Sequence, residues 1–268
     1  KTSQNHSLLL SSSGKVYSWG GNENGELGLN TNEVISKPKL ITDIIDRVTK
    51  ISVGDSHSLA VTSNGDVYGW GLSTHSELGL DYNIDTFSTN KNDKNAITKC
   101  KVRLPVKITT LNPHHITKTY CGSHFSMFIT ENNEVFSCGD NSKCQLGLED
   151  KTDILIPLQI ETLFTMKVEK ISCGESHCLA MIKDEITKTK TIWGWGSNLY
   201  GQLGLGNQIQ NTMPRPIAFF MDYIAIVDDV KCGKNFSVVL LRRKDKESVN
   251  EKNIMIKYND IIELFSHY

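Results

Sequence analysis

The chain has 268 residues and a formal net charge of −1, from 29 Lys and Arg against 30 Asp and Glu. This balance excludes the overall basic field that drives nonspecific binding to nucleic acid. An apolar fraction of 38% with 22% charged residues is typical of a soluble globular protein. No apolar run approaches the roughly twenty residues that span a bilayer, so we expect no membrane partner.

The cysteines indicate a reducing compartment. There are 7, an odd number, and none forms a Cys-x-x-Cys pair. Such thiols are ordinary inside a cell, whereas a secreted protein would carry one unpaired. The sequence therefore predicts an intracellular protein, nuclear or cytoplasmic. The chain begins without Met and partway through a repeat, so we expect a fragment.

Four segments along the chain share one pattern without internal gaps. A Trp or Cys is followed eight residues later by the Leu of Leu-Gly in every copy. The copies are YSWGGNENGELGL (17–29), YGWGLSTHSELGL (68–80), FSCGDNSKCQLGL (136–148) and WGWGSNLYGQLGL (193–205). A fixed spacing of this kind indicates an internal repeat.

A second landmark recurs upstream of these segments, in forms such as ISVGDSHSLAV (51–61) and ISCGESHCLAM (171–181). Its ring-bearing residue recurs after 51, 68, 52 and 59 residues. These residues are His6, His57, Phe125, His177 and Phe236. The variation in period falls in polar stretches, which predicts loops of unequal length on a constant unit.

Each unit is expected to consist of short strands. Segments such as HSLAV and DVYGWG are β-branched or aromatic and are bounded by Gly, Asn or Ser. Ser-Asn-Gly-Asp at 63–66 predicts a hairpin between two of them. Several strands per unit favour an all-β propeller, with repeats at about 14–61, 65–129, 133–181 and 190–240 within residues 1–245. The apolar residues of 246–268 fall on one helical face and predict a short C-terminal helix.

The motifs Gly-x-Ser-His-Ser/Cys-Leu-Ala, Gly-Asp-Val-Tyr-Gly-Trp-Gly and Glu/Gln-Leu-Gly-Leu together resemble the regulator-of-chromosome-condensation repeat. The resemblance covers residues 1 to about 243 and implies a propeller that is seven-bladed in the family. This chain supplies four full repeats and a leading half unit, so either blades are missing or the ring is incomplete.

Two further features are similar to the family's exchange factor for the small GTPase Ran. A long insertion (81–105) is followed by the Cys-Gly-x-x-Phe landmark at 121–125, and the last strand leaves through VVLLRRKDKES (238–248). The resemblance implies a protein-binding propeller that exchanges guanine nucleotide on a Ran-like GTPase. The alternatives are a noncatalytic scaffold, for example a domain of a larger regulatory protein, and a chromatin-binding module.

The repeated residues are expected to serve structure rather than chemistry. His exchanges with Phe at the ring position, and Cys121, Cys173 and Cys232 align with Val53. Zinc ligands would not be interchangeable with Val, so no metal is expected. The tryptophans occupy the ordinary repeat position, which favours packing over the chromophore cluster of the family's plant UV-B photoreceptor.

Partner-binding residues are predicted in two places. The first is the loop of the Gly-x-Ser-His landmark, where the resemblance implies an acidic contact from Asp55 and Glu175 and a histidine contact from His177. The second is the locally basic insertion at 81–107, with Lys99, Lys101 and Arg103, which is either a solvated loop or a binding loop.

No bond-making enzyme is expected. The sequence has no Gly-x-Ser-x-Gly and no Walker loop, and the Gly-x-Gly at 194–196 lacks a third glycine. No cofactor is implied, and the activity expected is at most nucleotide exchange.

Overall fold

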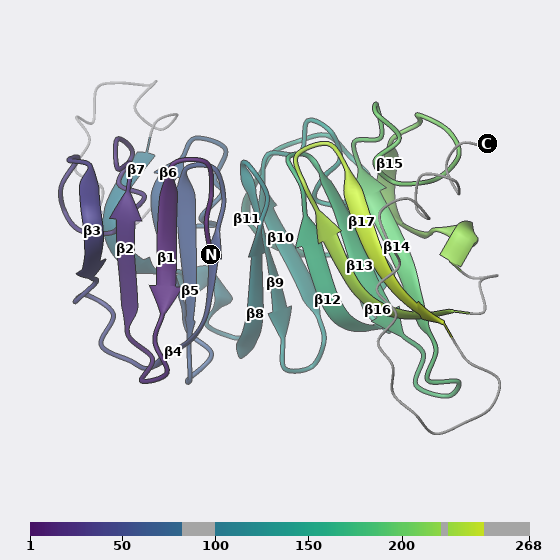
Figure 1. Cartoon of the computed structure of the whole chain (residues 1–268), viewed down its shortest axis with the longest axis horizontal. Coiled ribbons are helices and arrows are strands. Elements are labelled where there is room, and N and C mark those ends of the chain that lie inside the picture. The colour runs from purple at the N-terminus through teal and green to yellow at the C-terminus, as the bar shows by residue number, and fades with distance from the viewer. Residues whose placement is uncertain (82–99, 221–224, 244–268) are drawn as a thin grey trace.

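The computed structural model describes residues 1–81, 100–220 and 225–243, and these form an all-β molecule. Antiparallel sheets stand side by side, as Figure 1 shows. The predicted all-β class is therefore confirmed. The tail at 246–268, with its predicted helix, lies outside the described residues.

Five sheets follow one another along the chain, and the three central ones have four strands each. The first sheet contains β1 (His6–Leu10), β2 (Val16–Gly20) and β3 (Ile35–Leu40). The second contains β4 (Val48–Val53), β5 (His57–Thr62), β6 (Val67–Ser73) and β7 (Cys100–Lys107). The third contains β8 (Ile116–Cys121), β9 (Phe125–Thr130), β10 (Val135–Gly139) and β11 (Ile154–Gln159). The fourth contains β12 (Lys167–Cys173), β13 (His177–Lys183), β14 (Lys190–Gly196) and β15 (Asn211–Pro216), and the last pairs β16 (Ala225–Cys232) with β17 (Ser237–Arg243).

Three short 3₁₀ turns follow the outer strands of the central sheets. They are η2 (Thr109–Leu111), η3 (Glu161–Leu163) and η4 (Ala218–Phe220). Each turn carries the chain from the outer strand of one sheet to the inner strand of the next. No helix of the described residues is long and apolar enough to cross a bilayer.

The sequence repeats and the sheets are out of phase. The predicted repeat 65–129 contains β6 and β7 of the second sheet and β8 and β9 of the third. The repeats at 14–61, 133–181 and 190–240 straddle two sheets in the same way. One sequence repeat therefore covalently joins two neighbouring sheets.

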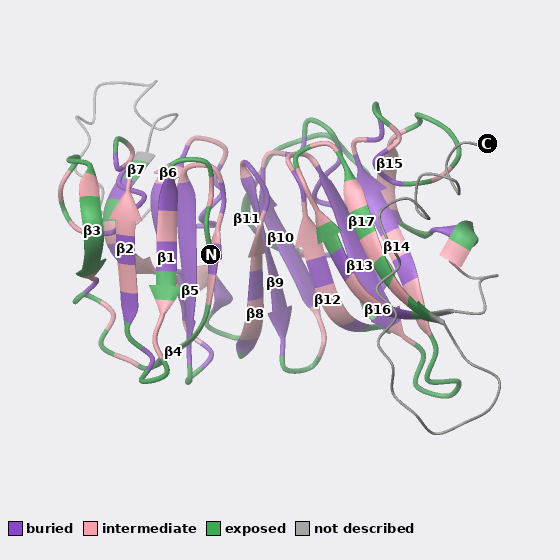
Figure 2. Ribbon diagram, in the orientation of Figure 1, coloured by how far each residue is buried: buried purple, intermediate pink, exposed green. Residues whose placement is uncertain are grey.

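The second and third strands of the central sheets form the core. All residues of β5 and β9 are buried, and Trp70 and Trp195 are fully buried. Figure 2 shows this burial in the middle of the array and exposed residues on the outer strand β3 and at the loops. The continuous apolar runs HSLAV and FSMFI are thus strands that are covered on both faces.

The outer strands are the positions that accept proline. Pro38, Pro105, Pro157 and Pro214 lie on β3, β7, β11 and β15, each at the edge of its sheet. Proline cannot donate a ladder hydrogen bond, which confines it to such edges. Residues 100–107, which were predicted to belong to an inserted loop, instead form the edge strand β7. Of that insertion, 82–99 lies outside the described residues.

Consecutive sheets are joined by the repeated tryptophan and the Glu/Gln-Leu-Gly-Leu segment of the preceding sheet. The Trp70 indole N–H donates to the Glu26 carbonyl oxygen at 2.7 Å, and Trp195 donates to Gln145 at 2.9 Å. At the third sheet the Cys138 thiol lies 3.6 Å from the Glu77 carbonyl oxygen. The Trp and the Glu/Gln-Leu-Gly-Leu segment are neighbours in the sequence motif. In the structure, the Trp of one sheet instead bonds the Glu or Gln of the preceding sheet.

The Leu-Gly turn itself needs glycine. Gly28 has a φ of +66°, and a Cβ there would lie 3.1 Å from the Trp70 ring. Gly147 has a φ of +75° and the same relation to Trp195. A side chain would be strained by the backbone and would separate the two sheets.

Candidate protein-binding rim

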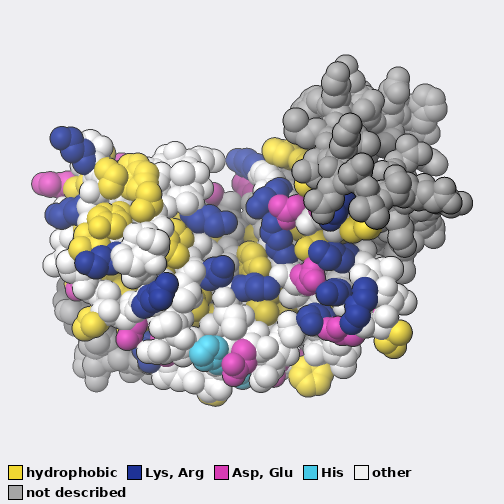
Figure 3. Space-filling model, turned by 60° about the horizontal axis from the view of Figure 1, so that its bottom comes forward, with side chains coloured by type: hydrophobic (Ala, Val, Ile, Leu, Met, Phe, Trp, Pro, Cys, Tyr) yellow, Lys and Arg dark blue, Asp and Glu magenta, His cyan; other side chains and the backbone are white. Residues whose placement is uncertain are grey.

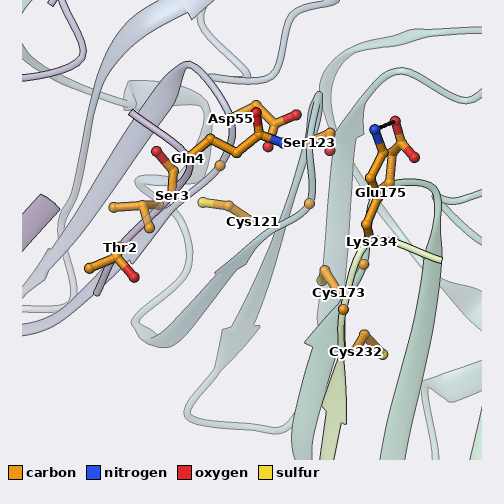
Figure 4. A pocket seen from close by; sticks show the side chains of 15 residues that line it. Thr2, Ser3, Gln4, Asp55, Cys121, Ser123, Cys173, Glu175, Cys232 and Lys234 are labelled. Carbon is orange, nitrogen blue, oxygen red and sulfur yellow. Dashed lines mark ion pairs between the residues drawn. The ribbon is translucent and has the colours of Figure 1, made fainter. Parts of the chain in front are cut away.

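A pocket of about 290 Å³ opens where the inner strands end, and it is built from equivalent residues of all five sheets. Three consecutive residues of each sheet line it. They are Thr2–Gln4, Val53–Asp55, Cys121–Ser123, Cys173–Glu175 and Cys232–Lys234. We call this surface the rim. Figure 4 draws its lining residues around the opening and labels Asp55, Ser123, Glu175 and Lys234 among them.

Backbone hydrogen bonds tie the rim loops to one another. The Asp55 N–H donates to the Ser123 carbonyl at 3.3 Å, Ser123 to Glu175 at 3.4 Å, and Glu175 to Lys234 at 3.1 Å. Each bond crosses from one sheet to the next. The four side chains at this position are therefore held at one level on a rigid frame.

The rim presents a mixed set of charges. Glu175 and Lys234 form an ion pair, with 3.5 Å between Oε1 and Nζ and side chains 36% and 63% exposed. Asp55 is half-buried and makes no ion pair among the described residues. An exposed pair contributes little stability, so Glu175 and Lys234 can change partners at small cost. The carboxylate of Asp55 is the unpaired charge of the rim.

The glycine of the Gly-x-x-His landmark lies under the ring. A Cβ on Gly54 would collide with the His57 imidazole, and one on Gly174 with that of His177. Gly122 has the same relation to the Phe125 ring. The ring thus packs against bare backbone, which explains why glycine recurs three residues before it.

Each buried histidine joins its own sheet to the next through a serine. His57 Nε2 lies 3.0 Å from Ser126 Oγ, and that hydroxyl donates to the Glu77 carbonyl oxygen at 2.6 Å. Since the serine proton goes to the carbonyl, the imidazole must donate from Nε2. Burial lowers the pKa of His57 to about 4, so the ring is neutral at pH 7.

Where phenylalanine replaces the histidine, cysteine replaces the serine. His6 with Ser58 and His177 with Ser237 repeat the polar arrangement, at 2.9 and 3.0 Å. Phe125 and Cys178, the residues at the equivalent positions, are both fully buried and belong to one apolar cluster. An imidazole N–H needs an acceptor, whereas a phenyl ring accepts the weakly polar thiol.

The predicted site residues are found in different environments. Asp55 and Glu175 lie on the rim. His177 is buried, and burial lowers its pKa to about 4, because its ring faces the next sheet rather than the opening. Its role in the described structure is to bond Ser237.

The basic residues of the insertion do not gather at the rim. Lys101 Nζ donates to the Glu23 carbonyl at 3.1 Å, and Arg103 Nε donates to Asn32 Oδ1 at 2.8 Å. Both side chains run from β7 to the loop that follows β2, so they connect the first two sheets. Lys99 lies outside the described residues.

Gln4 and Ser123 are rim residues that the sequence-based prediction missed, and Lys234, which aligns with Asp55, was not among the predicted binding residues. The available signal was their position, because each follows the residue equivalent to the landmark glycine, as Asp55 does. Cys121, Cys173 and Cys232, which align with Val53, are half-buried and line the same pocket.

No cysteine takes part in a potential metal cluster within the described ranges. The group of His, Cys, Asp or Glu with suitable spacing there is His75, Asp140 and Asp153. Its polar atoms already bond one another or the backbone, for example His75 Nδ1 with Asp153 Oδ2 at 2.8 Å and Asp140 Oδ1 with the Ser142 N–H at 2.8 Å. The clustered Cys173, His177 and Cys178 of the sequence are not such a group.

The repeated strand pattern and the five-sheet rim define a protein of the regulator-of-chromosome-condensation class. A family model described as an RCC1-like domain matches residues 1–248, and the chain belongs to that family.

Curated relatives include regulators of different kinds. The chain is 29% identical over 241 residues to the ultraviolet-B receptor UVR8 of Arabidopsis thaliana, covering 90% of this chain and 50% of UVR8. It is 29% identical over 215 residues to the human E3 ubiquitin-protein ligase HERC2, covering 79% of this chain and 4% of the ligase. The chain therefore spans half or less of the length of these relatives.

Solved structures share the fold. Human WBSCR16 superposes with a TM-score of 0.75 at 24% identity, covering 90% of this chain and 57% of that one. Prp20p of Saccharomyces cerevisiae superposes with a TM-score of 0.73 at 19% identity, covering 91% and 55%. At these identities the likeness establishes the propeller-type fold alone.

Proposed function

We propose that this chain is a protein-binding domain that recognises its partner through the rim. The observation that supports this most is a division of labour within the repeated loop. The repeated glycine and the His or Phe three residues later pack the sheets together. The residue directly after the glycine varies from Asp to Ser, Glu and Lys. These variable side chains converge on one opening, while the hydrogen bonds that join their loops are made by the backbone.

Such an arrangement suits recognition rather than bond-making. Loops on a rigid scaffold can present different side chains without a change in fold. The unpaired Asp55 carboxylate and the exposed Glu175–Lys234 pair favour a partner with a basic group that meets Asp55. Charge complementarity at a rim chiefly governs partner choice and association rate.

Charge reversal at the rim tests the proposal. The double variant Asp55→Lys/Glu175→Lys should lose the proteins that co-purify with the tagged chain, by at least tenfold in quantitative mass spectrometry. A matched control is Asp43→Lys/Glu161→Lys, which makes the same change at two exposed positions outside the rim. Retention of every partner by the rim variant at unchanged thermal stability would contradict the proposal.

A sharper candidate is nucleotide exchange on a Ran-like GTPase. It is favoured by the place of Asp55 in the rim and by the fold shared with Prp20p, whose solved structure is described together with binding to Gsp1p and histones. The landmark Phe125 does not add support, because its ring is fully buried in the core. The alternative is a noncatalytic scaffold that is one domain of a larger protein, and it is supported by the small share of the E3 ubiquitin-protein ligases HERC2 and HERC6 that the chain matches, 4% and 22%.

Release of fluorescent GDP separates these two candidates. An exchange factor should accelerate release from a Ran-type GTPase several-fold or more, and Asp55→Ala should reduce that acceleration. If release is unchanged while rim-dependent partners are still captured, the chain is a scaffold. Chromatin binding would instead appear as histones among the proteins that the rim variant loses.

A further inference from the structure

A second hollow, distinct from the rim, lies towards the amino-terminal ends of the inner strands. It has a volume of about 620 Å³. Its lining includes Lys50 and Ser52 of β4, Lys118 and Tyr120 of β8, and 167–170 of β12. We call this hollow the lysine groove. The rim occupies the opposite, carboxyl-terminal ends of the same strands.

Lysines occupy equivalent positions on successive strands of the groove. Each is the second residue after a buried Val or Ile of the inner strand: Lys50 after Val48, Lys118 after Ile116 and Lys170 after Val168. The same position on β16 is Asp229, which forms an ion pair with Lys170. The three lysines therefore form a row across three sheets, ended by a carboxylate.

Positive charge exceeds negative charge around the groove. Lys167 pairs with Glu185, and Glu169 pairs with both Lys190 at 2.9 Å and Lys183 at 3.8 Å. With the row itself this makes six lysines against the three carboxylates Glu169, Glu185 and Asp229. Figure 3, turned to bring this end of the molecule forward, shows the Lys and Arg side chains gathered over it. On a chain with a net charge of −1, this is a marked segregation.

Two of the lysines form no ion pair with a carboxylate among the described residues. Lys50 is exposed and forms no ion pair there. Lys118 is half-buried, and its Nζ donates to the Glu169 backbone carbonyl at 2.6 Å. Burial lowers the pKa of Lys118; the Glu169 carboxylate raises it, and the Lys50 charge lowers it by a smaller amount. A bound carboxylate would favour the charged form of this half-buried lysine.

The remaining lining favours a peptide over a nucleic acid. Half-buried Ile51 and Tyr120 provide the apolar surface beside the lysines, whereas Val168 and Met181 lie in the core behind them. Tyr120 is the single aromatic residue in the described lining, whereas single-stranded nucleic acids need a series of stacking platforms. An acidic peptide can supply carboxylates and apolar side chains together.

We propose that the lysine groove binds an acidic, partly apolar peptide segment of a partner protein, with its carboxylates on Lys50 and Lys118. The groove and the rim share no lining residue, although Ser52 and Tyr120 of the groove directly precede Val53 and Cys121 of the rim. This surface is independent of the function proposed for the rim.

Fluorescence anisotropy with a labelled peptide that alternates Glu and Leu tests this proposal. The wild-type chain should bind the peptide, with an affinity that falls steeply as salt rises from 50 to 300 mM. Lys50→Glu/Lys118→Glu should weaken binding at least tenfold. Lys50→Glu alone, at an exposed residue without an ion pair, should weaken it several-fold and guards against a folding defect in the double variant.

The matched control is Lys37→Glu/Lys39→Glu, which reverses two exposed lysines on the edge strand β3. This variant should bind as the wild type does. Equal losses in both double variants would overturn the proposal in favour of a general charge effect. Tighter binding of an oligouridylate of equal length would overturn the peptide assignment. Asp55→Lys should leave peptide binding intact, whatever its effect at the rim.

Discussion

At the scale of single residues, the His–Ser pair and the Phe–Cys pair are two solutions for one interface. In the polar solution the imidazole donates to a hydroxyl that itself donates to a main-chain carbonyl. The apolar solution occurs once in the described chain, between Phe125 and Cys178. His6, His57, Phe125 and His177 are buried at this position, and only Phe236, on the last described sheet, is exposed, so the exchange of His and Phe is explained by packing.

This interpretation predicts coupling between the two positions. His57→Phe and Ser126→Cys should each cost about 1–3 kcal/mol in the free energy of unfolding, because each leaves a buried hydrogen-bond partner unsatisfied or poorly satisfied. The double variant recreates the native Phe125–Cys178 pair and should cost less than the sum, by about 1 kcal/mol. Urea denaturation of the four proteins measures the difference, and strict additivity would contradict the pairing.

The same histidines predict a loss of stability in mild acid. Burial lowers the pKa of His57 and of His177 to about 4, below the usual value near 6.5. The unfolded chain therefore binds more protons than the folded chain between these pH values. Stability contributed by the neutral rings is complete above pH 6.5, falls as the pH drops below it and is lost at about pH 4.

Thermal unfolding of the wild type and of His57→Phe/Ser126→Cys between pH 7.5 and 4 isolates this effect from the carboxylates. The wild type should lose more stability than the variant as the pH falls, because the variant has one fewer buried imidazole to protonate. Parallel curves for the two proteins would show that His57 is not the neutral, buried group described above.

At the scale of elements, strands were predictable where they are short, β-branched and bounded by turns, as 57–62 and 67–73 are. Edge strands were harder to predict. β7 contains Lys101, Arg103 and Pro105, which resembles a loop, and its register is fixed by β6 and the loop after β2 rather than by its own pattern. The boundaries of the sheets were also not evident from the repeats. Each sequence repeat contains strands of two neighbouring sheets.

The tryptophan contacts predict a graded response. The Glu26 carbonyl accepts from Trp70 and also from Ser58 at 3.0 Å, whereas the Gln145 carbonyl accepts from Trp195 and only the Cys178 thiol at 3.8 Å. Trp195→Phe removes the stronger donor and should cost about 2–3 kcal/mol. Trp70→Phe leaves a hydroxyl donor in place and should cost about 1 kcal/mol less.

Guanidinium denaturation followed by circular dichroism compares the two variants. An equal cost, or a larger cost for Trp70→Phe, would contradict the assigned hydrogen bonds. Since stability in repeat proteins is a sum of unit and interface contributions, both losses should appear as weaker coupling between neighbouring sheets.

At the scale of the whole molecule, a constant framework carries variable surfaces. Residues that recur hold one sheet to the next, and residues that vary at matched positions face the rim. Asp55 and Glu175 could be predicted as rim residues from the repeated loop. Gln4, Ser123 and Lys234 become recognisable once the five loops are seen to converge on one pocket. That convergence depends on how the sheets are arranged in space rather than on the local sequence.

The lysine groove has the same origin. Lys50, Lys118 and Lys170 are separated by more than fifty residues along the chain, and the sequence offers no reason to group them until the inner strands stand side by side. The net charge of −1 conceals this segregation. In this fold, a candidate binding surface is therefore recognised by comparing the residues at equivalent positions of neighbouring sheets.

Site-specific photo-crosslinking tests the central claim, a protein-binding rim, most directly. A benzophenone amino acid placed at Asp55 should crosslink to a discrete partner in cell extract, and Glu175→Lys should suppress the product. The same group at Lys15, on the exposed hairpin at the opposite end of the molecule, should give none of that product. Crosslinking of the same partner from Lys15, with none from Asp55, would contradict the rim as the binding surface.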